Sequence, residues 1–292
     1  MEIKHVKHEK IDYLLWDKTI ANSQNSMIYA FSWFLDCVSP QWEALISENY
    51  EFVMPLPVKT KFGLKYIVQP FLTQQLGVFS SMQITELIVF DFIRSIPYLS
   101  YEMNLNEKNY VSSSISLPNL MLNLNVTYEN LVKKIAVNTL RNIRKAENYR
   151  LKMNWELNYV DFLQFFFEQT QRYDLPDKNI TKRLVLAAIE QKKIQLLGVK
   201  SVEGKLLAVL GLFTSGNKLI YLLPSSSTKG KEVSAMFFMV NAIIKKYAGT
   251  NTILDFEGSK IDGVARFYKG FGAKPTSYYL IKRFRFKFLI GK

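Results

Sequence analysis

The sequence contains very little cysteine and histidine: Cys37, His5 and His8 are all that its 292 residues provide. A single cysteine cannot form an intrachain disulfide, which fits a reducing compartment. Both histidines lie near the N-terminus, so we expect neither a Cys/His zinc site nor a histidine-based catalytic triad. The sequence therefore predicts a protein without a metal site.

Long apolar runs are missing as well. Residues 1–12 lack the apolar core of a signal peptide. The run 236–244 is interrupted by Asn241 and is far too short to cross a bilayer. We expect a soluble, cytoplasmic protein with no transmembrane segment, for which any membrane contact would be peripheral.

Acidic residues are in deficit. The chain has 25 Asp and Glu against 38 Lys and Arg, which gives a formal net charge of +13. Such a balance favours polyanionic partners, namely nucleic acid, phosphorylated cofactors or an anionic membrane surface. With 48% hydrophobic residues the chain is long enough to build two domains, and its composition is not that of a disordered protein.

Two parts of the chain, residues 42–105 and 194–257, show the same order of predicted elements. Each has three strands joined by short turns, a proline that closes the third strand, a polar loop, a helix and a returning strand. The spacing from Phe52 to Pro70 nearly equals that from Leu206 to Pro224. We interpret the pattern as an internal repeat.

The segment 254–275 reads LDFEGSKIDGVARFYKGFGAKP, which predicts a buried strand, a polar break and a helix from about Asp262. Within it, residues 265–272 resemble the end of the acetyltransferase (GNAT) fold, and more closely the F-[YK]-K-x-F-G segment of Fem-type aminoacyltransferases. The repeat agrees with this resemblance, because Fem-type enzymes are tandem pairs of that fold. The resemblance implies an α/β (α+β) protein of two GNAT-like domains, each a mixed, mainly antiparallel sheet flanked by helices. We place the N-terminal domain, with a helical cap, at 1–119 and the C-terminal domain, carrying the active site, at 120–292.

A basic helix is predicted over residues 127–148, between the repeats. One face of this helix is apolar. The opposite face carries Lys134, Arg141 and Lys145, and Arg144 lies next to them. A solvated charged face is one interpretation, but few acidic residues are available to pair with these cations. The segment also resembles the R-x-x-I-R-K-A helix of Fem-type proteins, so we favour recognition of an anion: tRNA phosphate, a nucleotide diphosphate or a lipid head group.

The loop expected to bind a donor lies at residues 227–232. Acetyltransferases that use acetyl-CoA have Q/R-x-x-G-x-G/A here, and its backbone N–H groups hold the pyrophosphate. Only Gly230 fits this pattern, and Glu232 would oppose a pyrophosphate, although Lys229 and Lys231 could offset it. The departure favours the Fem-like branch, whose donor is aminoacyl-tRNA, without deciding between that donor and acetyl-CoA or another acyl-CoA.

Acyl transfer to an amine requires a base, donors for the oxyanion and a proton for the leaving group. Glu257 is the candidate base, and Asp255 is expected on the same face, where paired carboxylates raise one pKa; capping or ion pairing is the alternative for both. Tyr268 occupies the position of the acetyltransferase tyrosine that protonates the leaving group, although packing would also explain it. By the same resemblance Lys269, with Arg266, would bind phosphate. We expect Gly258, Gly270 and Gly272 in turns. Residues 282–288 are expected to form a last strand with one basic face and one aromatic face.

These features lead to three candidate functions, of which two are enzymes and one is a binding protein. The first is an N-acyltransferase that moves an acyl or aminoacyl group from a carrier, CoA or tRNA, to an amine-bearing acceptor that could itself be phosphorylated. The alternative is a non-catalytic protein that uses the basic face of a duplicated GNAT fold to bind nucleic acid. A third reading is an ordinary CoA-dependent acetyltransferase with a degenerate loop.

Overall fold

The chain folds into two compact units. The computed structural model describes residues 1–170, 177–258 and 261–285. The first unit comprises Met1–Pro118 together with the chain from Ser277 onward, and the second unit comprises Asn119–Thr276. The division expected from the sequence differs at its C-terminal end, because the last strand hydrogen-bonds within the first unit.

The first unit contains a small three-stranded sheet, β1-β2-β3, and a set of four strands in the order β4-β5-β6-β13. In the second set β5 and β6 are parallel and the other neighbours are antiparallel. Its elements are β1 (Ile3–Val6), α1 (Tyr13–Asn22), α2 (Ser32–Val38), β2 (Glu43–Ser47), β3 (Val53–Leu56), β4 (Val58–Lys61), β5 (Leu64–Val68), α3 (Glu86–Arg94), β6 (Ser100–Leu105) and β13 (Lys274–Phe284).

The second unit has its strands in the order β7-β12-β11-β10-β9-β8. Strands β11 and β12 are parallel, and the neighbouring pairs are antiparallel. Its elements are β7 (Ile115–Asn123), α4 (Tyr128–Val132), α5 (Val137–Asn148), β8 (Lys152–Asn154), α6 (Tyr159–Thr170), α7 (Lys178–Glu190), β9 (Ile194–Lys200), β10 (Leu206–Ser215), β11 (Lys218–Ser226), α8 (Thr228–Glu232), α9 (Ala235–Tyr247), β12 (Ile253–Asp255) and α10 (Asp262–Gly270).

The two units repeat the same strand arrangement. Strands β4, β5 and β6 are joined antiparallel and then parallel, as β10, β11 and β12 are, with α3 or α9 before the third strand. A fourth strand, β13 or β7, then pairs antiparallel with that third strand. The predicted repeat is therefore confirmed for the second and third strands, the helix and the returning strand. It is not confirmed for the first strand, because β2 belongs to the small sheet with β1 and β3, whereas β9 pairs with β10 beside β11 and β12. The last strand agrees with the prediction up to Phe284, and residues 286–288 lie outside the described part of the chain.

The basic helix was predicted as one element and is in fact two. Helix α4 ends at Val132 and α5 begins at Val137. Between them the N–H of Ala136 donates to the carbonyl of Gly270, 2.9 Å away, instead of to a carbonyl of the same helix. Because the helix is interrupted there, Lys134 lies in the connection and does not share a helical face with Arg141.

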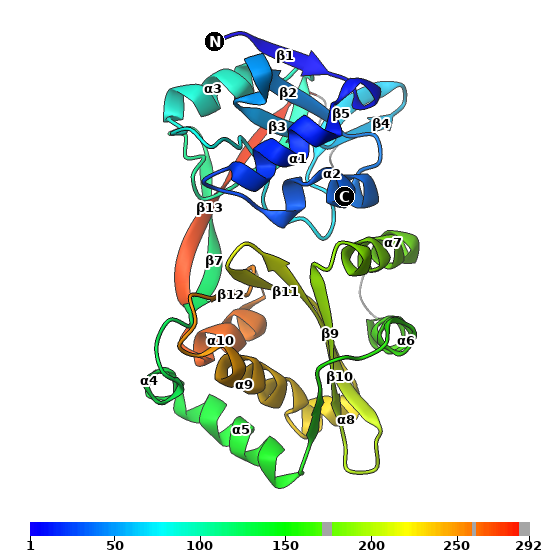
Figure 1. The fold of residues 1–292 in the computed structure, drawn as a ribbon, viewed down its shortest axis with the longest axis vertical. Helices are drawn as coiled ribbons and strands as arrows, with labels where there is room; N and C mark the ends of the chain where they lie inside the picture. Colours follow the sequence, from blue (N-terminus) through cyan, green and yellow to red (C-terminus); the bar gives the residue numbers. More distant parts are fainter. Residues whose placement is uncertain (171–176, 259–260, 286–292) are drawn as a thin grey trace. The chain divides into compact units, whose positions relative to one another are not determined.

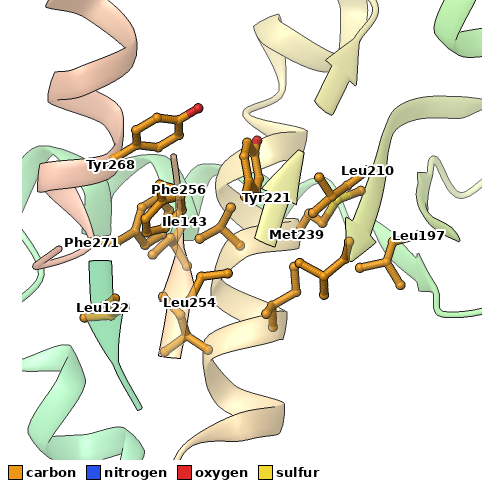
Figure 2. Close-up of a cluster of buried hydrophobic side chains, with 14 of the residues drawn as sticks. Leu122, Ile143, Leu197, Leu210, Tyr221, Met239, Leu254, Phe256, Tyr268 and Phe271 are labelled. Carbon is orange, nitrogen blue, oxygen red and sulfur yellow. The ribbon is translucent and has the colours of Figure 1, made fainter. Parts of the chain in front are cut away.

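The core of the second unit is aliphatic and aromatic, and Figure 2 shows its centre. Helix α9 packs on β9 and β10, with α5 against α9, while α6 and α7 cover the other face of these strands (Figure 1). The buried side of α5 consists of Thr139, Ile143 and Ala146, as its periodicity predicted. This packing leaves the basic side of α5 facing solvent.

Candidate active site

Two parallel strands of the second unit separate, and the candidate site lies where they do. Strands β11 and β12 pair only from Lys218↔Ile253 to Ile220↔Asp255, after which β12 ends and β11 continues to Ser226. Pro224 therefore sits inside β11 and does not close it, contrary to the prediction. Proline has no backbone N–H to donate. On the side where β12 has ended there is no strand to accept such a hydrogen bond, so the sheet loses none.

Glu257 follows the end of β12 in a backbone conformation that is unusual for its type. Its φ is +59°, in the left-handed region that residues other than glycine seldom adopt. The expected alternation along the strand thus stops at Asp255. Instead, Oδ1 of Asp255 accepts hydrogen bonds from the Glu257 backbone N–H, 2.9 Å away, and from Nδ2 of Asn119, 3.0 Å away. These bonds make Asp255 a residue that shapes the turn.

Glu257 is half-buried. Burial raises its pKa to about 8, from an ordinary value near 4.5. Burial also raises the pKa of Tyr268, and the negative charge of Glu257 raises it further. Glu257 and Tyr268 are therefore close enough to interact, although they come from different elements, the end of β12 and α10.

Tyr221 is a third polar group at this place, and the sequence analysis did not single it out. Its ring centroid lies 5.6 Å from those of both Phe256 and Tyr268, and the rings of Phe256 and Tyr268 stack at 4.6 Å. The hydroxyl groups of Tyr221 and Tyr268 point to the same side of the apolar cluster (Figure 2). Burial raises the pKa of Tyr221 well above its ordinary value. Its position directly after the paired part of β11 becomes visible only in the sheet.

The expected donor loop forms the short helix α8, and its polar groups are partly used within the loop. The N–H of Gly230 donates to Oγ of Ser227 at 3.0 Å, and the N–H of Lys231 donates to the Ser227 carbonyl at 2.9 Å. Nζ of Lys229 lies 3.1 Å from a carboxylate oxygen of Glu232. A Cβ at Gly230 would come within 2.1 Å of the Leu207 carbonyl oxygen, so this glycine permits close packing of α8 on β10.

The exposed cations of α10 lie beside the buried tyrosine. Arg266 and Lys269 are exposed, whereas Tyr268 between them is 6% exposed. The end of α10 packs against the start of α5: a Cβ at Gly270 would lie 2.3 Å from Oγ1 of Thr139. Gly270 therefore serves helix packing and not a turn, unlike the expectation.

The residues that follow α10 bring Lys134 to the same region. Gly272 has a φ of +85° and lies against Lys134, whose Cβ would be 3.2 Å from a Cβ at this glycine. Gly258 also has a positive φ, of +68°. Lys134 and Lys269 thus lie near the contact of α10 with the chain before α5. On α5 itself the exposed cations are Arg141, Arg144 and Lys145.

Two further properties of the described residues bear on function. Among residues 1–170, 177–258 and 261–285, three or more His, Cys, Asp or Glu side chains are nowhere grouped so that they could hold a metal ion. In the same part of the chain, no helix is both long and apolar enough to cross a membrane. The expectation of a cytoplasmic location remains a prediction.

No family model matches the sequence, and no curated protein matches it. Solved structures do match. FemX is similar with a TM-score of 0.71 at 13% identity, over 100% of both chains. The C-terminal domain of a putative lysylphosphatidylglycerol synthetase from Agrobacterium fabrum is similar over 82% of this chain and 84% of its own, with a TM-score of 0.56 at 11% identity.

A third match is to N-myristoyltransferase of Saccharomyces cerevisiae, over 96% of this chain and 78% of that one, with a TM-score of 0.51 at 11% identity. At these identities the similarity concerns the fold. The full coverage by FemX agrees with the repeated strand arrangement of the two units. The chain therefore has the mixed α/β fold of tandem GNAT proteins such as FemX.

Proposed function

We propose that the protein is an N-acyltransferase whose reaction takes place where β11 and β12 separate. The observation that carries the proposal is Glu257: a carboxyl group held in a left-handed turn, with a pKa near 8, beside Tyr268. A base with a pKa near the working pH is the type that removes a proton from an attacking amine. Perturbed carboxyl groups cluster at functional sites, which supports the same assignment.

In this reaction the amine nitrogen attacks the acyl carbon of the carrier. A C–N bond forms, the amine proton passes to the ionised Glu257, and the bond from the acyl carbon to the carrier breaks. The leaving group takes the hydroxyl proton of Tyr268, and Tyr221 supplies a second hydroxyl at the same place. Asp255 acts as a positioning residue, because it holds the backbone N–H of Glu257.

The tyrosine favours an ester donor over a thioester. Burial keeps Tyr268 protonated to a higher pH than an ordinary tyrosine, and an ordinary tyrosine is already less acidic than a thiol. Proton transfer from Tyr268 to a thiolate would therefore be uphill. An alkoxide released from an ester is much more basic and accepts the proton readily, so we propose an aminoacyl ester as donor.

The charge of the second unit supports a polyanionic carrier such as tRNA. Residues 119–276 contain 24 Lys and Arg and 13 Asp and Glu, a formal charge of +11. The internal hydrogen bonds of α8 leave less of that loop for a pyrophosphate, which favours tRNA over CoA. We assign carrier phosphates to Arg141, Arg144 and Lys145 on α5, with Lys134, Arg266 and Lys269 near α10 and Lys229 and Lys231 on α8.

The test is transfer of a labelled amino acid from charged tRNA to a mixture of amine acceptors. We expect Glu257→Gln to lower the rate by about 10²–10⁴-fold with tRNA binding unchanged. The rate of the wild-type protein should rise with pH through about 8, as Glu257 ionises. Saturable binding of acetyl-CoA at high salt, without binding of tRNA, would contradict the proposed donor.

A non-catalytic nucleic-acid-binding protein is the second candidate, and the charge of +11 on residues 119–276 favours it equally. The two candidates differ in which substitutions should abolish function. Arg141→Glu should weaken tRNA binding and reduce its salt dependence in both cases. If Glu257→Gln and Tyr268→Phe change no measurable activity while Arg141→Glu abolishes binding, the binding protein is the better description.

A further inference from the structure

A hollow of about 250 Å³ lies in the second unit, between α6 and the hairpin of β9 and β10, and the proposed reaction does not use it (Figure 1). Strand β10 runs from Leu206, which lines the hollow, to Leu212, which pairs with Tyr221 of the candidate active site. At about 3.3 Å per residue, these two places are about 20 Å apart along the strand. The hollow is therefore a separate place on the same unit.

The floor of the hollow is apolar. Leu157 and Leu206 meet over Gly198, because a Cβ at this glycine would lie 3.0 Å from Cδ1 of Leu206 and 3.3 Å from Cδ2 of Leu157. Phe165 lines the hollow from α6 and is 8% exposed. An apolar lining with a few polar groups is typical of small-molecule sites, and drug-sized ligands take pockets of about 300–1,000 Å³. This hollow is smaller, so it suits a molecule of the size of a single amino acid.

Charged side chains of both signs line the same hollow: Asp161 and Glu168 from α6, and Lys200 from β9. The two acidic residues stand about two helical turns apart on one side of α6. Lys200 is opposite Leu206 in the ladder, so both side chains lie on the same face of the sheet. Among the ion pairs of the described residues, none joins Lys200 to either carboxylate.

Hydrogen bonds within α6 and its first turn occupy only part of each carboxylate. Oδ2 of Asp161 accepts from Nδ2 of Asn158 at 2.6 Å, and Oε1 of Glu168 accepts from Nε2 of Gln164 at 3.0 Å. The second oxygen of each carboxylate is left for a ligand, as is the ammonium group of Lys200. Exposed charges on a helix are ordinarily explained by solvation alone. Here, however, opposite charges line one apolar hollow without neutralising each other.

We infer that this hollow binds a free α-amino acid with an apolar side chain, or a similar amino carboxylate. The ligand carboxylate contacts Lys200, its ammonium group contacts Asp161 or Glu168, and its side chain lies on the apolar floor. A ligand with one charge of each sign accounts for both signs in the hollow, whereas a simple cation or a simple anion leaves one of them opposed. The inference does not depend on the proposed reaction.

The test is calorimetric titration of the full chain at pH 7 with leucine, isoleucine, methionine and phenylalanine. Two analogues dissect the recognition: leucinamide lacks the carboxylate, and 4-methylpentanoate lacks the ammonium group. We expect saturable binding of at least one amino acid, and binding of the leucine analogues about fivefold or more weaker than that of leucine.

Variants assign each contact. Lys200→Gln should bind leucine about fivefold more weakly and leucinamide as the wild type does, because leucinamide has no carboxylate for Lys200 to contact. Asp161→Asn combined with Glu168→Gln should weaken leucine by a similar factor and leave 4-methylpentanoate no weaker. Folding is not in question, because Asp161 and Glu168 are exposed and Lys200 is half-buried.

Lys182→Gln and Glu190→Gln are the matched controls, because both residues are exposed on α7 and neither lines the hollow. Both should bind leucine as the wild type does. The inference is overturned if none of the four amino acids binds at millimolar concentration, or if the controls lose as much as Lys200→Gln. Binding of leucinamide or spermidine as tight as that of leucine would make the hollow a cation site and overturn it too. So would a loss of leucine binding in Glu257→Gln equal to that in Lys200→Gln, because the amino acid would then bind at the candidate active site.

Discussion

At the scale of single residues, the proposed chemistry depends on where one carboxyl group is held. The turn at φ +59° and the hydrogen bond from its N–H to Asp255 hold Glu257 near Tyr268. Such a position destabilises the folded protein once the carboxyl ionises, because a buried charge loses hydration.

This cost predicts how stability changes with pH. The pKa of Glu257 is about 8 in the folded protein and near 4.5 when unfolded, so the folded state binds more protons in between. Stability should therefore fall as pH rises from about 4.5 to 8. Glu257→Gln cannot ionise, and we expect it to be more stable than the wild type at pH 9 by about 2 kcal/mol, and equal to it at pH 4.5.

Urea unfolding of both proteins at the two pH values measures this difference. Glu232→Gln is the control, because the Glu232 side chain is 59% exposed and its contact with Lys229 is a surface ion pair. That variant should change stability by less than about 1 kcal/mol at either pH. A difference between Glu257→Gln and wild type that is independent of pH would show that burial does not shift the Glu257 pKa.

At the scale of elements, α8 illustrates how a glycine that suggests phosphate binding is explained by packing. Gly230 lies so close to β10 that a Cβ would come within 2.1 Å of the Leu207 carbonyl oxygen. A backbone oxygen cannot move aside as a side chain can. The same glycine gives its N–H to Ser227, and that bond forms the first turn of α8.

We expect Gly230→Ala to destabilise the second unit by about 2 kcal/mol or more, because α8 must shift away from β10. Gly263→Ala is the matched control. Gly263 lies in α10 with nothing within 4 Å of its Cβ position, so alanine should stabilise that helix by about 0.5–1 kcal/mol. Thermal unfolding of the two variants should move in opposite directions. A Gly230→Ala protein as stable as the wild type would mean that α8 is not held against β10.

At the scale of the whole molecule, the chain starts in the first unit, forms the second and returns to the first. Strand β13 pairs with β6 from Tyr279↔Leu105 to Phe284↔Ser100. The first unit is therefore completed by residues at the far end of the sequence. Contacts of such separation form late and slowly in folding, because a long loop must close first.

This connectivity predicts the effect of removing the C-terminal strand. Deletion of residues 277–292 should leave β6 with an unpaired edge and speed hydrogen exchange of its amides, while β12 keeps its protection. Deletion of residues 286–292 is the control, because it leaves the pairs from Tyr279↔Leu105 to Phe284↔Ser100 in place. Hydrogen exchange read by mass spectrometry distinguishes the two. Unchanged protection of β6 in the longer deletion would contradict the assignment of β13 to the first unit.

The sequence alone determined the strand–turn–strand–helix–strand order that the two halves share, the basic balance, the strand–turn–helix segment around Glu257 and the buried side of α5. All of these follow from local periodicity and composition, which the amino-acid order carries directly. It failed at Pro224, at the interruption before α5 and at Gly270, since each depends on a partner that lies far away in the sequence. Only the tertiary structure brought Tyr221 to Tyr268, turned Glu257 out of its strand and placed β13 beside β6. Periodicity reports that a side chain is buried, but which element buries it is decided by long-range packing.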